Sequence, residues 1–318
     1  MTSGRWRLGL ALALATGLLW STLAIILKSA LEQIDAWSLT WFRFALAFAF
    51  FAVWVAVRKR PGRLRELEGR EWLVLVVAAA MLTTNYMTYL TGLDYTTPAN
   101  AQLLIQLAPL SLAIGGFVFF RERFTRPQWL GAVVLLSGLG LFFRDQLTTF
   151  SASRASYLIG SSFIMAAALS WAIYALCQKR LLAVLGAPTV LMFIFGFATV
   201  VLLPWVDFGV FAGIDAWHWA AVLYCGINTV AAYSAFSQAL VHVEASRVSA
   251  VLAINPLLTL ACVAAAHATY PDVFPEAYVT SLGILGAFVA VGGSMLTTLS
   301  PGQRTLSKVS ESGVARDA

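Results

Sequence analysis

Long runs of apolar residues are the feature that most constrains what this chain can fold into. Ten runs approach or exceed the roughly 20 residues that a helix needs to cross a bilayer core. They cover 8–28, 37–57, 72–92, 98–120, 127–144, 156–178, 187–206, 217–239, 245–267 and 278–299. Many are apolar on nearly every side, whereas barrel strands alternate apolar and polar residues. The sequence therefore predicts an all-α polytopic membrane protein with ten transmembrane helices.

Composition supports this class and excludes an ordinary soluble protein. Hydrophobic residues make up 60% of the chain and charged residues only 11%, against about 25% charged residues in soluble domains. The net charge of +6 does not indicate nucleic-acid binding, because the basic residues lie between apolar runs and do not gather on one helical face. The expected partners are the lipid bilayer and a small-molecule substrate.

The basic residues are distributed unevenly between the two sides of the predicted membrane. If the N-terminus is cytoplasmic, seventeen Lys and Arg residues fall in cytoplasmic segments, and only Lys28, Arg144 and Arg154 fall on the other side. The positive-inside rule then predicts that both termini are cytoplasmic. A cleaved signal peptide is the alternative for the first run, but the recurrence of its sequence later in the chain favours a retained helix.

The chain contains an internal repeat. The segment 20–28 aligns with 171–179, Pro109 aligns with Pro256, and Gly131 aligns with Gly283. Because five helices are an odd number, the second unit must enter the membrane from the opposite side, an arrangement characteristic of secondary transporters. The predicted organisation is a cytoplasmic N-terminus at 1–7, five-helix units at 8–144 and 156–299, a connecting loop at 145–155, and a disordered cytoplasmic tail at 300–318.

Several of these segments resemble one known unit. L-L-W-S at 18–21, L-D-Y-T-T-P-A-N-A-Q-L-L-I-Q-L-A-P-L at 93–110 and F-F-R-E-R-F-T-R-P-Q-W-L-G at 119–131 are similar to the EamA-type unit of the drug/metabolite transporter superfamily. The second unit departs from the pattern after its fourth run, where H-A-T-Y-P-D-V-F-P-E-A-Y from His267 replaces the acidic turn that contains Glu122 in the first unit. The resemblance implies a ten-helix carrier of small organic metabolites or drugs, often an exporter, in a bacterial cytoplasmic membrane.

Two prolines point to the position of a substrate cavity. Pro109 and Pro256 lie at the centres of the fourth run of each unit. Each removes a backbone donor, which should leave the carbonyls of Ile105 and Leu252 without an intrahelical partner. Such a defect is tolerated in a membrane where it faces protein or a wet cavity. The alternative is a pair of kinks that only shape helix packing.

Amide and aromatic side chains near these prolines complete the predicted site. Gln102 and Gln106 share a helical face with Pro109, and Asn255 directly precedes Pro256. Aromatic walls with a few amides suit a medium-sized, partly apolar or cationic solute. The alternative functions are interhelical hydrogen bonding for the amides and interfacial anchoring for the tryptophans. The predicted substrate-binding residues are Trp20, Asn85, Tyr89, Gln102, Gln106, Pro109, Trp171, Tyr174, Tyr233, Asn255 and Pro256.

Ionisable residues within the predicted spans are few. No Asp or Glu lies near the middle of a predicted span, which disfavours proton coupling through a buried carboxylate. Arg43 lies two turns inside the second span. Its side chain could snorkel to the interface, pair with Glu32 or Asp35, or bind an anionic substrate group, and we favour the two structural alternatives.

Taken together, these features predict a secondary transporter that moves a small organic metabolite or drug-like solute by alternating access. An intramembrane enzyme or a channel is the alternative. An enzyme would need a nucleophile with its base, paired carboxylates or a metal cluster, and the three histidines lie near span ends. No cofactor or metal is expected. Small residues at 135–140 and 283–294 permit close helix packing within a monomer, or formation of a homodimer.

Overall fold

The computed structural model describes most of the chain, and this part is all-helical. The described residues are 5–58, 67–108, 110–111, 125–149, 154–181, 184–242, 248, 251–271 and 279–299, and they contain no strand. The helices are α1 (Trp6–Ala30), α2 (Ala36–Val57), α3 (Gly69–Tyr95), α4 (Pro98–Leu104), α6 (Arg126–Thr149), α7 (Arg154–Leu181), α8 (Ala187–Leu202), the 3-10 turn η3 (Leu203–Trp205), α9 (Val210–Gly213), α10 (Ala216–His242), α12 (Asn255–Thr269) and α13 (Ser281–Leu299).

Acidic side chains cap the first turns of α2 and α3. The Asp35 carboxylate accepts hydrogen bonds from the backbone N–H groups of Trp37 and Ser38, and so caps α2. Glu68 and Glu71 form a capping box at the start of α3. Each cap satisfies backbone donors that lack an intrahelical acceptor. These carboxylates therefore mark where the chain leaves a connecting segment and begins a span.

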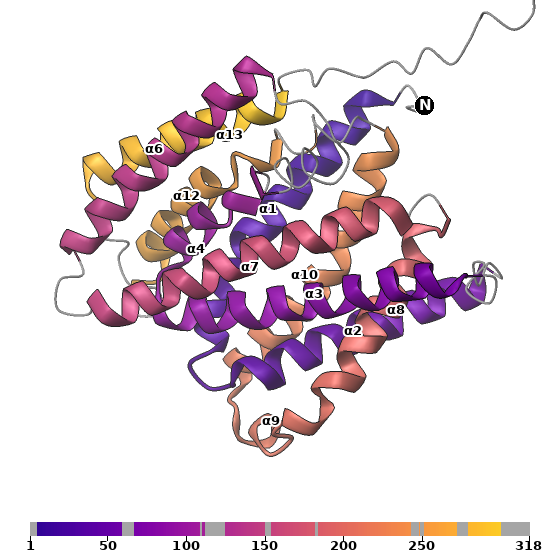
Figure 1. Cartoon of the computed structure of the whole chain (residues 1–318). Coiled ribbons are helices and arrows are strands. Elements are labelled where there is room, and N and C mark those ends of the chain that lie inside the picture. The colour runs from indigo at the N-terminus through magenta and orange to yellow at the C-terminus, as the bar shows by residue number, and fades with distance from the viewer. Residues whose placement is uncertain are drawn as a thin grey trace, which may run out of the picture.

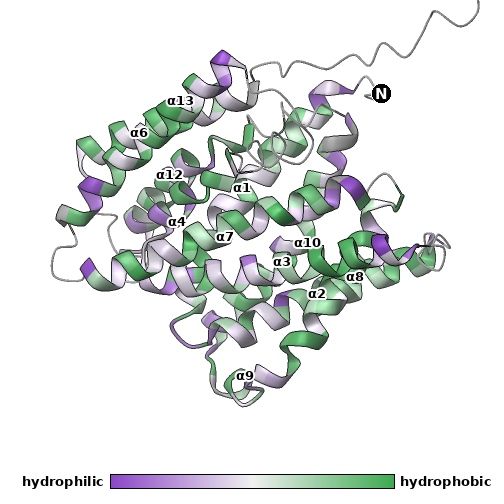
Figure 2. Ribbon diagram, viewed as in Figure 1, coloured by the Kyte–Doolittle hydropathy of each residue, from purple (hydrophilic) through white to green (hydrophobic). Residues whose placement is uncertain are grey.

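Seven helices in the described part of the chain are long and apolar enough to cross a membrane: α1, α2, α3, α6, α7, α10, and α8 together with η3. Apolar residues dominate their length (Figure 2). Many of these apolar side chains point outward; Val200, for example, has 71% of its surface exposed. The apolar part of α13, Ser281–Thr297, is shorter, and the fourth predicted spans are interrupted at 105–106 and 253–254. The all-helical membrane class is confirmed, and the count of ten helices stays a prediction.

Helices from the two halves of the chain are interleaved. Helix α1 packs along α10 and α3 packs along α7, so the first span of each half lies against the third span of the other half. The second spans, α2 and α8, pack together, and so do the fifth spans, α6 and α13 (Figure 1). The short helices α4 and α12 also contact each other. The main packing contacts thus join the two halves in matching pairs.

Glycines allow two of these pairs to approach closely. A methyl group at Gly138 of α6 would meet the backbone of Ala290 and Gly286 in α13. Likewise, a methyl group at Gly92 of α3 would lie 2.8 Å from the carbonyl oxygen of Gly160 in α7. Gly140 has open space around it. The prediction that small residues pack α6 and α13 together within one chain is therefore confirmed.

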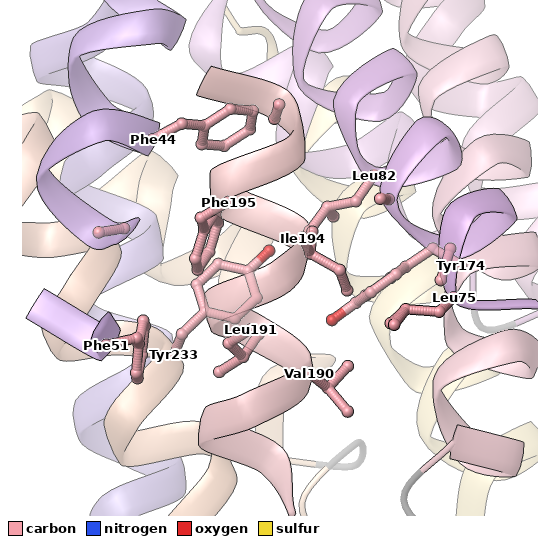
Figure 3. Close-up of a cluster of buried hydrophobic side chains, with 14 of the residues drawn as sticks. Phe44, Phe51, Leu75, Leu82, Tyr174, Val190, Leu191, Ile194, Phe195 and Tyr233 are labelled. Atoms are coloured by element: carbon pink, nitrogen blue, oxygen red, sulfur yellow. The ribbon is translucent and has the colours of Figure 1, made fainter. Parts of the chain in front are cut away.

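A cluster of buried hydrophobic side chains forms where α2, α3, α7, α8 and α10 meet. Figure 3 shows Phe195 of α8 between Phe44 of α2 and Tyr233 of α10. The Phe195 ring centroid lies 5.3 Å from that of Phe44 and 5.6 Å from that of Tyr233. Tyr174 of α7 is buried in the same cluster. This core holds the second spans against the helices that carry the candidate site.

Candidate functional site

The fourth span of the first half is interrupted next to the predicted proline. After α4, the N–H of Gln106 donates to the Leu103 carbonyl at 3.1 Å, and the N–H of Ala108 donates to the Ile105 carbonyl at 2.9 Å. These are three-residue turns that are tighter than an α-helix. The prediction that the Ile105 carbonyl lacks a partner is therefore wrong, because a tightened turn satisfies it. Pro109 itself lies outside the described residues.

The fourth span of the second half is interrupted at the matching position. A turn at 253–254 precedes α12, and the N–H of Ile254 donates to the Val251 carbonyl at 3.2 Å. Pro256 lies in the first turn of α12, where a helix tolerates a residue without an N–H group. Each half thus has a short non-α-helical segment beside its fourth-span proline.

Hydrogen bonds link each interruption to the other half of the chain. The Gln106 side-chain amide donates to the Ala253 carbonyl at 2.6 Å, and the Ser21 hydroxyl of α1 donates to the Asn255 carbonyl at 3.3 Å. The Gln106 side-chain oxygen accepts from Ser294 of α13 at 3.5 Å. An amide of one half therefore satisfies a carbonyl at the break of the other, as the need for paired polar groups in a membrane requires.

A cavity of about 190 Å³ lies beside these interruptions. Its polar lining consists of Arg43, Asn85, Gln102, Gln106 and Asn255. Its aromatic lining consists of Trp20, Tyr86, Tyr89, Trp171, Tyr233 and Phe236. The other described residues of the wall are Leu23, Ala24, Leu27, Leu90, Ile105, Ala108, Leu252 and Ala253. Both halves of the chain contribute, because the wall includes parts of α1, α2, α3 and α4 together with α7, α10 and α12.

The structure brings most of the predicted site residues together in this cavity. Of the eleven, eight line it: Trp20, Asn85, Tyr89, Gln102, Gln106, Trp171, Tyr233 and Asn255. Tyr174 lies in the hydrophobic core instead, and Pro256 is buried at the start of α12 without lining the cavity. The binding function of the eight residues stays a prediction.

The amides at the cavity wall also connect helices. Asn85 of α3 donates to the Ala167 carbonyl of α7 at 2.9 Å. Gln102 donates to the Tyr89 hydroxyl at 3.2 Å and to the Trp20 carbonyl at 3.4 Å. The interhelical hydrogen bonding considered as an alternative from the sequence is thus present, and it holds these side chains at the cavity wall. The Asn255 side-chain oxygen, by contrast, is buried and has no hydrogen-bond partner among the described residues.

The aromatic wall is built around Trp20. Its ring centroid lies 5.7 Å from that of Phe236 and 6.1 Å from that of Tyr233, the latter in an edge-on arrangement. Edge-on and tilted pairs of this kind are favourable and fix ring orientation. Both partners come from α10, which packs along α1. The rings therefore form a defined apolar surface on one side of the cavity.

Arg43 lines the cavity, although the sequence did not place it among the predicted site residues. Its side chain is only 2% exposed, and its Nε donates to the Thr229 hydroxyl at 3.1 Å. Both structural alternatives favoured from the sequence are wrong. The side chain does not snorkel, and the described contacts of Glu32 and Asp35 are with His218 and with the start of α2, respectively. Only the depth of Arg43 within its span signalled a position at the cavity.

A polar cluster lies at the N-terminal end of α10, away from this cavity. Asp215, which precedes α10, accepts hydrogen bonds from the backbone N–H and the ring Nδ1 of His218, both at 2.9 Å. These hydrogen bonds lower the pKa of Asp215 to about 2, and the Gln33 side chain adds to the effect. No group of three or more His, Cys, Asp or Glu side chains suited to a metal occurs in the described ranges.

Comparison with known proteins gives consistent matches over nearly the whole chain. The sequence profile of the EamA-like transporter family matches residues 7–144 and 158–299. The chain is 33% identical over 293 residues to YhbE of Escherichia coli strain K12, described as an uncharacterized inner membrane transporter, covering 92% of this chain and 91% of that protein. It is 30% identical over 292 residues to an uncharacterized transporter of Haemophilus influenzae, covering 92% of this chain and 95% of that protein.

The fold is also found among solved structures. A crystal structure with 19% sequence identity aligns with a TM-score of 0.64, and the match covers 94% of this chain and 98% of the other. At this level of identity the match shows the fold alone.

Proposed function

Because the chain belongs to the EamA-like transporter family, we propose that it is a secondary transporter that exports a small organic solute across the bacterial cytoplasmic membrane by alternating access. Family membership indicates a transporter rather than the enzyme considered as an alternative. The family and the names of the relatives support transport and a membrane location. The mechanism, the direction and the kind of solute are our proposals.

The observation that carries the proposal is the cavity at the two interrupted helices. It lies beside two breaks, one from each half of the chain, and the Gln106–Ala253 hydrogen bond joins them. In secondary transporters, discontinuous helices lie at the substrate site, near the middle of the membrane. A hydrogen bond between the halves can open as the halves rock and re-form when they return. The cavity would then face each side of the membrane in turn.

The matching helix pairs support an inverted arrangement of the two units. We propose that residues 8–144 and 156–299 are related by a pseudo-two-fold axis in the membrane plane, with both termini in the cytoplasm. The first span of each half packs against the third span of the other half, which is the pattern expected for such an axis. We propose that the transporting unit is one chain, alone or within a homodimer.

The size of the cavity supports a small solute. A volume of about 190 Å³ is less than the roughly 300–1,000 Å³ of sites that hold drug-sized ligands. The wall is mostly apolar and aromatic, with a few amides. A metabolite with a compact apolar body therefore suits this conformation better than a large drug.

Solute flux into proteoliposomes tests the proposal. The full chain is assayed against a panel of radiolabelled metabolites, and the active solutes are then measured with Gln106→Leu and Asn255→Leu. Gln238→Leu is the matched control, because Gln238 is exposed on α10 and does not line the cavity. We expect the control to transport as the natural chain does.

We expect at least a tenfold loss of flux in the two cavity variants at equal reconstitution. Leucine removes the Gln106 donor from the Ala253 carbonyl, and it removes the side-chain amide of Asn255 from the cavity wall. Equal flux in Gln106→Leu, Asn255→Leu and the control would refute the proposal that solute passes through this cavity.

A further inference from the structure

A buried guanidinium lies at the wall of the cavity. Arg43 is in α2, two turns from its start, and contacts Thr229 of α10 through Nε and the Tyr86 ring of α3, whose centroid lies 4.8 Å from the guanidinium carbon. Its Nη1 atom is buried and has no hydrogen-bond partner in the described part of the chain. Arg43 thus retains an unused donor beside the cavity.

The charge of Arg43 has no described counter-ion. Within the described residues, Lys28 pairs with Asp94, the His218 ring lies beside the carboxylates of Glu32 and Asp215, and no carboxylate contacts Arg43. Arg43 is also the one charged residue among those described at the cavity wall. An ionised group held away from water without an opposite charge is strongly unfavourable. A neutral hydroxyl and an aromatic face offset only part of that cost.

We propose that Arg43 binds the carboxylate of the transported solute, so that the substrates are small organic monoanions. This inference rests on the proposed transport function and names its substrate class. A guanidinium presents paired donors that match a carboxylate, and the apolar body of the solute would lie against the Trp20 side of the wall. One cationic residue balances one negative charge, and a dianion such as a phosphate monoester would be left with an unpaired charge in the cavity.

The rival explanation is that Arg43 only links helices. Its two contacts reach α10 and α3, so it could stabilise packing without touching a solute. The two explanations differ in what they predict for ligand selectivity. A binding function predicts that a negative charge on the ligand matters and that this preference depends on Arg43. A packing function predicts that charge does not matter.

Matched acids and amides test this difference. Binding of benzoate against benzamide, phenylacetate against phenylacetamide, and lactate against lactamide is measured to the full chain in nanodiscs by thermal shift and by tryptophan fluorescence. The variants are Arg43→Met and Arg43→Lys. Arg58→Met is the control, because Arg58 is exposed at the end of the same helix, over the Trp54 ring.

We expect at least one acid to bind the natural chain and Arg58→Met at least tenfold more tightly than its amide. Arg43→Met should lose this preference, and Arg43→Lys should retain only part of it, because an ammonium lacks the planar pair of donors. Failure of every acid to exceed its amide, or an unchanged preference in Arg43→Met, would overturn the inference. If Arg43→Met does not fold, Arg43→Lys decides, and an unchanged acid affinity there would overturn it.

The outcomes separate this inference from the transport proposal. Gln106-dependent flux of neutral solutes, with no preference for acids, would leave transport in place and refute the role of Arg43. Acid binding that is lost in Arg43→Met, with no flux of any solute tested, would support the binding site and refute transport.

Discussion

The close contact between α6 and α13 predicts that one added methyl group destabilises the protein at one glycine and not at its near neighbour. In Gly138→Ala, the new methyl group would meet the backbone nitrogen and Cα of Ala290 and would lie 2.7 Å from the Gly286 carbonyl oxygen. These are main-chain atoms that cannot rotate away, so the two helices must separate. In Gly140→Ala, the methyl group meets nothing within 4 Å.

The pair of variants isolates the packing strain. Both substitutions gain the same helix propensity, about 1 kcal/mol for alanine over glycine, so this gain cancels in the comparison. Forcing an extra methyl group into a packed contact costs about 1–3 kcal/mol. We therefore expect the free energy of unfolding of Gly138→Ala to be about 1–3 kcal/mol lower than that of Gly140→Ala.

Reversible unfolding in mixed micelles measures this difference. The purified variants are titrated with SDS and followed by far-ultraviolet circular dichroism, with the natural chain as reference. Gly140→Ala should unfold at the same or a higher SDS fraction than the natural chain, and Gly138→Ala at a lower SDS fraction than Gly140→Ala. Equal midpoints for the two variants would show that α6 and α13 do not approach as closely as described, and the reasoning would be wrong.

Two further predictions concern charged residues. Arg43→Met should raise the melting temperature of the unliganded protein or leave it unchanged, because it removes a buried charge without a counter-ion; a clear decrease in a thermal scan would contradict this. Asp215→Asn should lower the melting temperature at pH 6, because the folded protein favours the Asp215 carboxylate by lowering its pKa from 3.8 to about 2. That contribution is complete above pH 4 and is lost as the pH falls through 2, so melting scans of both proteins should converge there, and a constant gap would contradict the linkage.

The membrane class and the location of the cavity could be predicted from sequence because both depend on local patterns. Hydropathy over twenty residues identifies spans without knowledge of their partners. A proline in the middle of a span must disturb hydrogen bonds wherever the helix packs. Gln106 and Asn255 lie within three residues of such prolines, and both were therefore found from spacing alone.

The position of Arg43 and that of Tyr174 could not be predicted in this way, because they depend on contacts between distant segments. The hydroxyl that Arg43 contacts belongs to Thr229, 186 residues later in the chain. Tyr174 and Trp171 are one helical turn apart, yet Trp171 lines the cavity and Tyr174 is buried in the hydrophobic core. Only the rotation of α7 against its neighbours separates them, and hydropathy does not specify that rotation when nearly every face is apolar.

The packing of early helices against late helices constrains the order in which the protein can fold during synthesis. The close contact of Gly92 with Gly160 joins α3 to α7, and the contact of α1 with α10 joins the start of the chain to a late helix. While a ribosome has delivered only the first half, both α1 and α3 still lack the surfaces that they finally cover. The packing of α1 and α3 can therefore be completed only after the second half of the chain has been synthesised.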